Sequence, residues 1–337
     1  MKKVIKFGLK KSLIMFQNSK NIISKNWDYL LIIFPIWIPL GYFLLITNFP
    51  KFENIFFILV MIFLGETHFG STWWMYFEKK NMEWAYQNKT YSMYYPLCIL
   101  IFLITLAIVV SLELSLFLIL LFNVFHVTKQ SSGIIKVYTK DTDERINSEK
   151  ISNSLYFIST IIIIYGLLKF VLKIKSIEGY SLHINLFAMA YILISNFYFY
   201  FILKFKNIRS LTSYMTGILM WMPLLWVDKI YHAFAMGVGM HYVQYLAITL
   251  TIYYRKNNIK EMKEKIADNK FLYMFIGYLL IYSLIMVALT NMEFSKNLYL
   301  FLIPIFFQTL HFYADMFTWK FSNPYIRENV GKFLYRK

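Results

Sequence analysis

The chain alternates between long apolar runs and short polar segments that are mostly basic. A helix needs about 20 residues to cross a hydrocarbon layer of about 30 Å. Ten runs approach or exceed that length: residues 28–49, 54–78, 92–110, 113–137, 153–172, 181–203, 211–227, 229–254, 271–290 and 297–321. This pattern predicts an all-α fold, a polytopic helical bundle in a membrane with about ten transmembrane helices.

The two ends of the chain are basic and differ from the apolar middle. Residues 1–26 interleave Lys with apolar side chains and have neither the continuous apolar core nor the cleavage site of a signal peptide. We expect this segment to be a cytoplasmic amphipathic arm on the lipid surface. Residues 27–321 are predicted to form a single transmembrane domain, and residues 322–337 a basic cytoplasmic tail.

Charge supports this organisation and indicates which side faces the cytoplasm. The chain has 35 Lys and Arg against 18 Asp and Glu, with 58% hydrophobic and 20% aromatic residues. In the ten-span prediction, 27 of the basic residues fall on the side that also holds both termini. Cytoplasmic loops carry such an excess. The net charge of +17 therefore indicates contact with anionic lipid rather than with nucleic acid, and the expected location is a bacterial inner membrane.

Cysteine content limits the kinds of site that the chain can build. Cys98 is the one cysteine in the sequence, so an intramolecular disulfide and a thiolate cluster for zinc or iron–sulfur are excluded. A metal would have to bind through His, carboxylate or amide groups.

Four of the six histidines fall at one predicted depth. His68, His126, His241 and His311 lie in four spans that run in the same direction, 12 to 15 residues from the outer end of each. At about 1.5 Å per residue this places them about 18–23 Å deep. His183 and His232 lie near the outer ends of their spans. The four deep histidines are the predicted metal ligands.

Polar residues accompany each of these histidines at helical spacing. Residues three or four apart share a helix face, and such neighbours commonly orient metal ligands. The predicted supporting residues are Asn123, Gln244, Gln308, Thr72 and Lys129, and the candidate catalytic groups are Asp315, Gln130 and Glu66. Glu66 is turned away from His68 by its two-residue spacing. Asp315 is either a ligand or acid–base group, or the counter-charge of Lys129.

Three interpretations of the histidines remain open from the sequence. They form a metal site, they line a proton or ion pathway, or they are unrelated histidines that bond between helices, each contributing about 1 kcal/mol. The common depth favours the metal site. One histidine per helix is typical of a mononuclear centre, whereas membrane di-iron enzymes carry clustered His pairs.

The segment "GETHFG" (65–70) and the one-histidine-per-span layout of His68, His126, His241 and His311 resemble the Brp/Blh family of bacterial membrane carotene dioxygenases. That resemblance implies iron held by scattered intramembrane histidines. The chain departs from the family pattern because Phe69 separates His68 from Gly70 and the later histidines are not closely spaced.

The predicted function is therefore a membrane-embedded, metal-dependent oxidoreductase or oxygenase, an enzyme with non-haem iron. Neutral imidazoles suit Fe(II), with Zn, Mn or Cu as alternatives. The expected partners are the lipid bilayer, a lipophilic substrate such as a carotenoid, polyprenoid or acyl lipid, and dioxygen. The alternatives are a proton-coupled transporter or channel that uses the same His, Asp and Lys residues as a relay, and a scaffold without chemistry.

Overall fold

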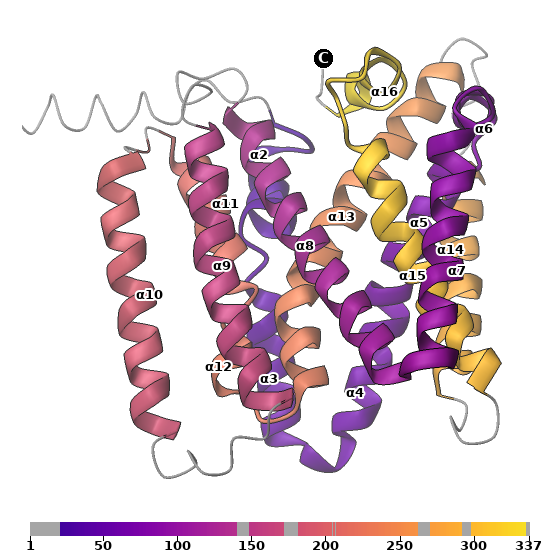
Figure 1. The fold of residues 1–337 in the computed structure, drawn as a ribbon. Helices are drawn as coiled ribbons and strands as arrows, with labels where there is room; N and C mark the ends of the chain where they lie inside the picture. Colours follow the sequence, from indigo (N-terminus) through magenta and orange to yellow (C-terminus); the bar gives the residue numbers. More distant parts are fainter. Residues whose placement is uncertain are drawn as a thin grey trace, which may run out of the picture. The chain divides into compact units, whose positions relative to one another are not determined.

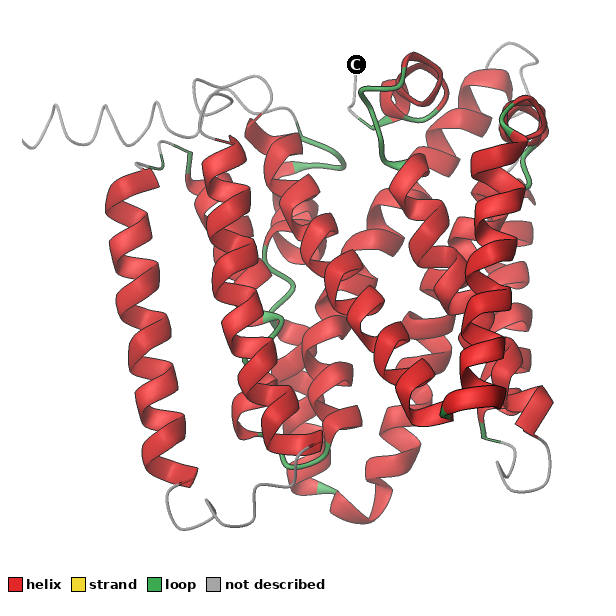
Figure 2. Ribbon diagram, viewed as in Figure 1, coloured by secondary structure: helices red, strands yellow, loops and turns green. Residues whose placement is uncertain are grey.

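The computed structural model describes residues 21–139, 148–171, 181–203, 205, 207–261, 270–291 and 298–334. All regular structure in these residues is helical, with no strand (Figure 2), so the predicted all-α class is confirmed. Residues 1–20 of the predicted amphipathic arm lie outside the described part.

The α-helices follow the predicted apolar runs closely. They are α2 (Lys25–Trp27), α3 (Trp37–Asn48), α4 (Glu53–Val60), α5 (Glu66–Tyr76), α6 (Lys79–Gln87), α7 (Tyr95–Thr105), α8 (Leu112–Thr139), α9 (Ser148–Val171), α10 (Ser181–Leu203), α11 (Ile208–Leu219), α12 (Pro223–Trp226), α13 (Ile230–Glu261), α14 (Lys270–Thr290), α15 (Leu298–Thr318) and α16 (Pro324–Asn329). Four π-helical turns adjoin these helices: Asp28–Ile33 follows α2, Met61–Gly65 joins α4 to α5, and Thr90–Tyr94 and Leu106–Val110 flank α7.

Several helices can cross a membrane. By length and composition, five in the described residues qualify: Pro50–Tyr76, Thr90–Val110, Leu112–Thr139, Ile230–Lys256 and Leu272–Thr290. The pair Lys25–Ile33 and Trp37–Asn48 makes a sixth if it is counted as one span. The full count of ten spans and the cytoplasmic position of both termini stay predictions.

Two predicted spans are interrupted. The span expected at 28–49 bends by 55° between Ile33 and Trp37, around Pro35. The span expected at 211–227 breaks before Pro223. Proline has no N–H for the helical ladder and its ring clashes with the preceding turn. At the first break, side chains satisfy the freed carbonyl groups, because Thr216 donates to Ile33 and Gln244 donates to Ile32.

The chain divides into two compact units, and α8 and α13 contribute to both. The first unit comprises residues 1–50 and 127–244. In it, α9 packs against α10, α11 and α12, and α11 also contacts the π-helical turn at Asp28–Ile33.

The second unit comprises residues 51–126 and 245–337 and holds most of the predicted site residues. Its centre is formed by α5, α14 and α15, which all contact one another, and α7 packs against α15. The short helices α6 and α16 lie at one end of this unit (Figure 1). Gly70 permits the close approach of α5 and α14, since a Cβ there would lie 2.8 Å from the ring of Tyr282.

Candidate metal centre

Three imidazoles and one carboxylate converge inside the second unit. His68 comes from α5, His126 from α8, and His311 and Asp315 from α15, and all four side chains are buried. His311 Nε2 lies 2.9 Å from His68 Nε2 and 3.3 Å from His126 Nε2. Asp315 Oδ2 lies 3.8 Å from His126 Nε2 and 3.9 Å from His311 Nε2. We call these four residues the histidine cluster.

Local helix geometry places these side chains. His311 and Asp315 are four residues apart, as are His68 and Thr72, so each pair lies on one face of its helix. The π-helical turn at Met61–Gly65 immediately precedes α5 within the span Pro50–Tyr76. A π turn adds a residue to the helical repeat and so rotates the next helical segment about the axis. It therefore sets the direction in which the His68 face points.

The spacing of the nitrogens fits ligands of one metal ion. A metal–nitrogen bond of about 2.1 Å gives nitrogen–nitrogen separations of about 3.0 Å at right angles and about 3.4 Å in a tetrahedron. The observed separations of 2.9 and 3.3 Å agree with this range. In His126, His311 and Asp315, one potential ligand atom of each side chain lies within 4.8 Å of the other two, close enough for a shared ion.

Hydrogen bonding identifies which nitrogen of His311 is available. Thr72 Oγ1 donates to Asp315 Oδ1 at 3.1 Å and lies 2.9 Å from His311 Nδ1. Since a threonine hydroxyl has one proton, it must accept from His311, and Nδ1 carries the ring proton. The lone pair of His311 is then on Nε2, the atom that faces the other two imidazoles.

The Thr72 hydroxyl also helps to hold the carboxylate of Asp315, together with the hydroxyl of Tyr245. Tyr245 on α13 donates to Asp315 Oδ1 at 2.8 Å, so this oxygen receives hydrogen bonds from two hydroxyls, and Tyr245 also contacts Thr72. Asp315 Oδ2 accepts no hydrogen bond from a described residue. A carboxylate with one oxygen fixed and the other directed at imidazoles is the arrangement expected of a metal ligand and its orienting partners.

Aromatic rings enclose the cluster. The Phe69 ring centre lies 4.9 Å from that of His311, and the Phe312 ring centre lies 5.0 Å from that of His126. The Tyr245 ring lies edge-on to His68 at 4.2 Å. An apolar shell of this kind controls the access of solvent to a metal and its local dielectric.

Two predicted site residues pair with each other outside the cluster. Glu66 is buried, and its Oε1 accepts a hydrogen bond from Gln308 Nε2 at 3.0 Å. The two-residue spacing from His68 directs Glu66 to the other side of α5. Gln308 was predicted to support His311, and its observed partner is Glu66.

The remaining predicted residues are divided between the two units. Asn123 lies half-buried on α8 in the second unit. In the first unit are the exposed Lys129, the half-buried Gln130, the buried His241, and Gln244, whose amide donates to Ile32. The assignment of His241 as a fourth ligand stays a prediction.

The two outer histidines both belong to the first unit. His232 bonds to the hydroxyl of Tyr42 through Nδ1 at 2.7 Å within the first unit. His183 belongs to α10, and its side chain lies outside the described residues.

Sequence reasoning missed Tyr245. The available signal was its position four residues after His241, on the same face of a long helix. Tyrosine is abundant here, at 27 residues, so spacing alone did not distinguish it.

Similarity to known proteins does not assign a function to this site. The chain matches no described protein family, no curated protein and no solved structure.

Proposed function

We propose that this protein is a membrane-embedded, metal-dependent oxidoreductase or oxygenase that acts on a lipophilic substrate. The observation that carries the proposal is the convergence of His126, His311 and Asp315 beside His68. His126, His311 and Asp315 form a set of two histidines and one carboxylate, which is typical of non-haem Fe(II) oxygenases, and His68 adds a third imidazole. The proposed metal is therefore Fe(II).

A metal-free explanation fits the same geometry less well. If the three imidazoles only bonded one another, N–H groups of His68 and His126 would share the single lone pair of His311 Nε2. Asp315 would then be a buried carboxylate whose ion-pair partners among the described residues are two histidines. Burying a charge without full pairing costs several kcal/mol. A divalent cation would remove both problems.

The protein's own groups have distinct roles in this proposal. His68, His126, His311 and Asp315 would hold the metal, which would supply redox chemistry. Thr72 fixes the ring proton of His311 on Nδ1 and, with Tyr245, orients Asp315. Phe69 and Phe312 keep water out.

The substrate class is inferred from the surroundings of the cluster. The spans of the second unit expose large apolar side chains, among them Ile101, Ile108 and Val109 on α7 and the π-helical turn after it. A lipid-soluble molecule could reach a buried site there without crossing water. The resemblance of "GETHFG" to the Brp/Blh family is in line with this proposal.

The test is the metal content of the purified protein. We expect near-stoichiometric iron, and loss of most of it on replacing His68, His126 or His311 by Ala, because one ion shared by three helices has no spare ligand. Asp315→Asn should retain the fold and lower metal content or turnover by about 10–100-fold, the usual effect of disturbing a group at a metal site. His232→Ala is the control, since His232 bonds to Tyr42.

Two results would decide the ligand set. Full iron in two or more of the three cluster variants would overturn the site. His241→Ala separates a three-histidine from a four-histidine centre, because only the latter loses its iron.

A proton-coupled transporter is the second candidate, and the helix break at Pro35 favours it, since interrupted spans are common in transporters. The carbonyls of Ile32 and Ile33 at this break already accept hydrogen bonds from Gln244 and Thr216. Those atoms are thus engaged, which weakens the case for an ion site there. Absence of bound metal, with proton-driven uptake in vesicles that is lost in Asp315→Asn, would establish the transporter instead.

A further inference from the structure

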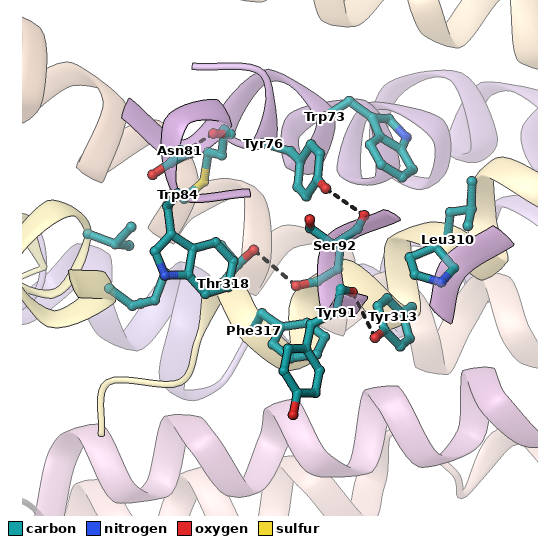
Figure 3. A pocket seen from close by; sticks show the side chains of 15 residues that line it. Trp73, Tyr76, Asn81, Trp84, Tyr91, Ser92, Leu310, Tyr313, Phe317 and Thr318 are labelled. Atoms are coloured by element: carbon teal, nitrogen blue, oxygen red, sulfur yellow. Dashed lines mark hydrogen bonds between the residues drawn. The ribbon is translucent and has the colours of Figure 1, made fainter. Parts of the chain in front are cut away.

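An aromatic pocket lies in the second unit where α5, α6, α15 and α16 meet (Figure 3). Its volume is about 180 Å³. The walls include rings from separate elements, namely Trp73 and Tyr76 of α5, Trp84 of α6, and Tyr313 and Phe317 of α15.

The walls of the pocket offer no ionic partner to a charged occupant. None of the described residues that line the pocket carries a charge. The hydroxyls of Tyr76 and Tyr313 donate to the backbone carbonyls of Ser92 and Tyr91 (dashed lines in Figure 3). The two donor–acceptor distances are 2.9 and 2.8 Å. Thr318 likewise donates to the carbonyl of Ala314. The hydroxyls are therefore engaged with the protein, and the surface left for a ligand is mainly ring faces and aliphatic groups.

The volume limits what can bind. A dry cavity of about 150 Å³ is large enough for benzene. The pocket of about 180 Å³ accordingly has room for one ring-sized group, and a long chain would have to extend beyond it. Aromatic walls favour a planar occupant, because rings attract one another edge-to-face or in offset stacks.

The pocket adjoins the histidine cluster through shared helices. On α15 the pocket residues Leu310 and Ala314 each directly precede a cluster residue, His311 and Asp315. On α5 the pocket residue Trp73 comes directly after Thr72. A ligand anchored in the pocket would therefore lie within about one helix diameter, roughly 10 Å, of the cluster.

We propose that this pocket binds one uncharged, ring-sized apolar end group of the membrane substrate while the remainder of the molecule lies outside it. As a substrate site it rests on the proposed function, although binding of the ring can be measured without turnover. The proposal narrows the substrate class to lipophiles that end in a ring.

Cysteine protection tests the proposal in the intact chain. Replacing Cys98 by Ser gives a cysteine-free background, and Thr318→Cys then places one thiol at the pocket wall. Met316→Cys is the matched control, because Met316 is exposed on the same helix. Toluene at about ten times its Kd should slow N-ethylmaleimide labelling of the Thr318→Cys protein about tenfold, by mass action. The Met316→Cys protein should label at an unchanged rate, and benzylammonium, a charged probe of similar size, should protect neither.

A second variant removes one wall. Trp84→Ala in the Thr318→Cys background should abolish protection by toluene, whereas Trp226→Ala, at an exposed position of the first unit, should not. No protection by toluene, equal protection of both thiols, or protection by benzylammonium would each overturn the proposal.

Iron content measured on the same samples separates the two proposals. Iron without toluene protection refutes the ring site alone, and toluene protection without iron refutes the metal enzyme alone.

Discussion

Glu66 and Asp315 are both buried carboxylates on helices of the second unit, and their hydrogen bonds distinguish their roles. Asp315 has one oxygen held by Tyr245 and Thr72 and the other directed at imidazoles. Glu66 bonds to the amide of Gln308 instead. Glu66 and His68 therefore have different surroundings, although only one residue separates them in the sequence. Of the two acids, Asp315 is the one positioned to act with the histidines.

We predict that Tyr245→Phe weakens metal binding by about tenfold, the lower end of the range for groups that orient ligands. The change removes the hydroxyl that donates to Asp315 and leaves the ring that packs on His68. Competition with a chelator of known affinity measures the change, and circular dichroism checks that the helices remain. Tyr282→Phe serves as the control, because its hydroxyl makes no hydrogen bond to the described residues of the cluster. Equal affinities in both variants would show that Tyr245 acts only through packing.

Among the elements, α13 depends on a close approach that only glycine allows. A Cβ at Gly237 would lie 1.8 Å from the backbone carbonyl oxygen of Met220, in the break between α11 and α12. No side-chain rotation can relieve a contact with backbone. The break therefore serves a packing function in the first unit, since it brings a carbonyl against the surface of a long helix.

We predict that Gly237→Ala lowers the free energy of unfolding by about 1–3 kcal/mol, the usual effect of forcing extra volume into a packed interior. Thermal unfolding in detergent, followed by tryptophan fluorescence, measures it. Gly41→Ala in the same unit is the control, because Gly41 lies in α3 and nothing is within 4 Å of an added Cβ. Gly41→Ala should leave the free energy of unfolding unchanged or raise it, since alanine favours a helix by about 0.5–1 kcal/mol over glycine. An undiminished melting temperature for Gly237→Ala would contradict the packing described.

For the whole molecule, the orientation of the chain in the membrane can be tested without determining the number of spans. Lys51 and Lys79 are exposed and lie at opposite ends of the candidate span Pro50–Tyr76, Lys51 just inside it and Lys79 just beyond it. In a Cys98→Ser background, Lys51→Cys should react with an impermeant thiol reagent in intact cells. Lys79→Cys should react only after the cells are opened, because the Lys-rich segment 79–91 belongs on the cytoplasmic side. Reaction of both thiols in intact cells would mean that Pro50–Tyr76 does not cross the membrane.

The fold class and the helix positions were largely predictable from the sequence. Predicted ranges such as 181–203 and 271–290 coincide with α10 and α14 to within a residue. The reason is physical and local. In an apolar environment a chain must satisfy its own N–H and C=O groups, so a long apolar run becomes a helix wherever it lies. The breaks at Pro35 and Pro223 were the exceptions, because a single proline changes the path without changing the hydropathy.

The sequence by itself also identified His68, His126, His311 and Asp315 as candidates, since spacing along a helix determines which residues share a face and an approximate depth. Tertiary structure decided the rest. How far each helix rotates about its own axis depends on packing with its neighbours, and that rotation brought three Nε2 atoms together and paired Glu66 with Gln308. It also brought the Tyr245 hydroxyl to Asp315, a contact between residues 70 positions apart that no local pattern encodes.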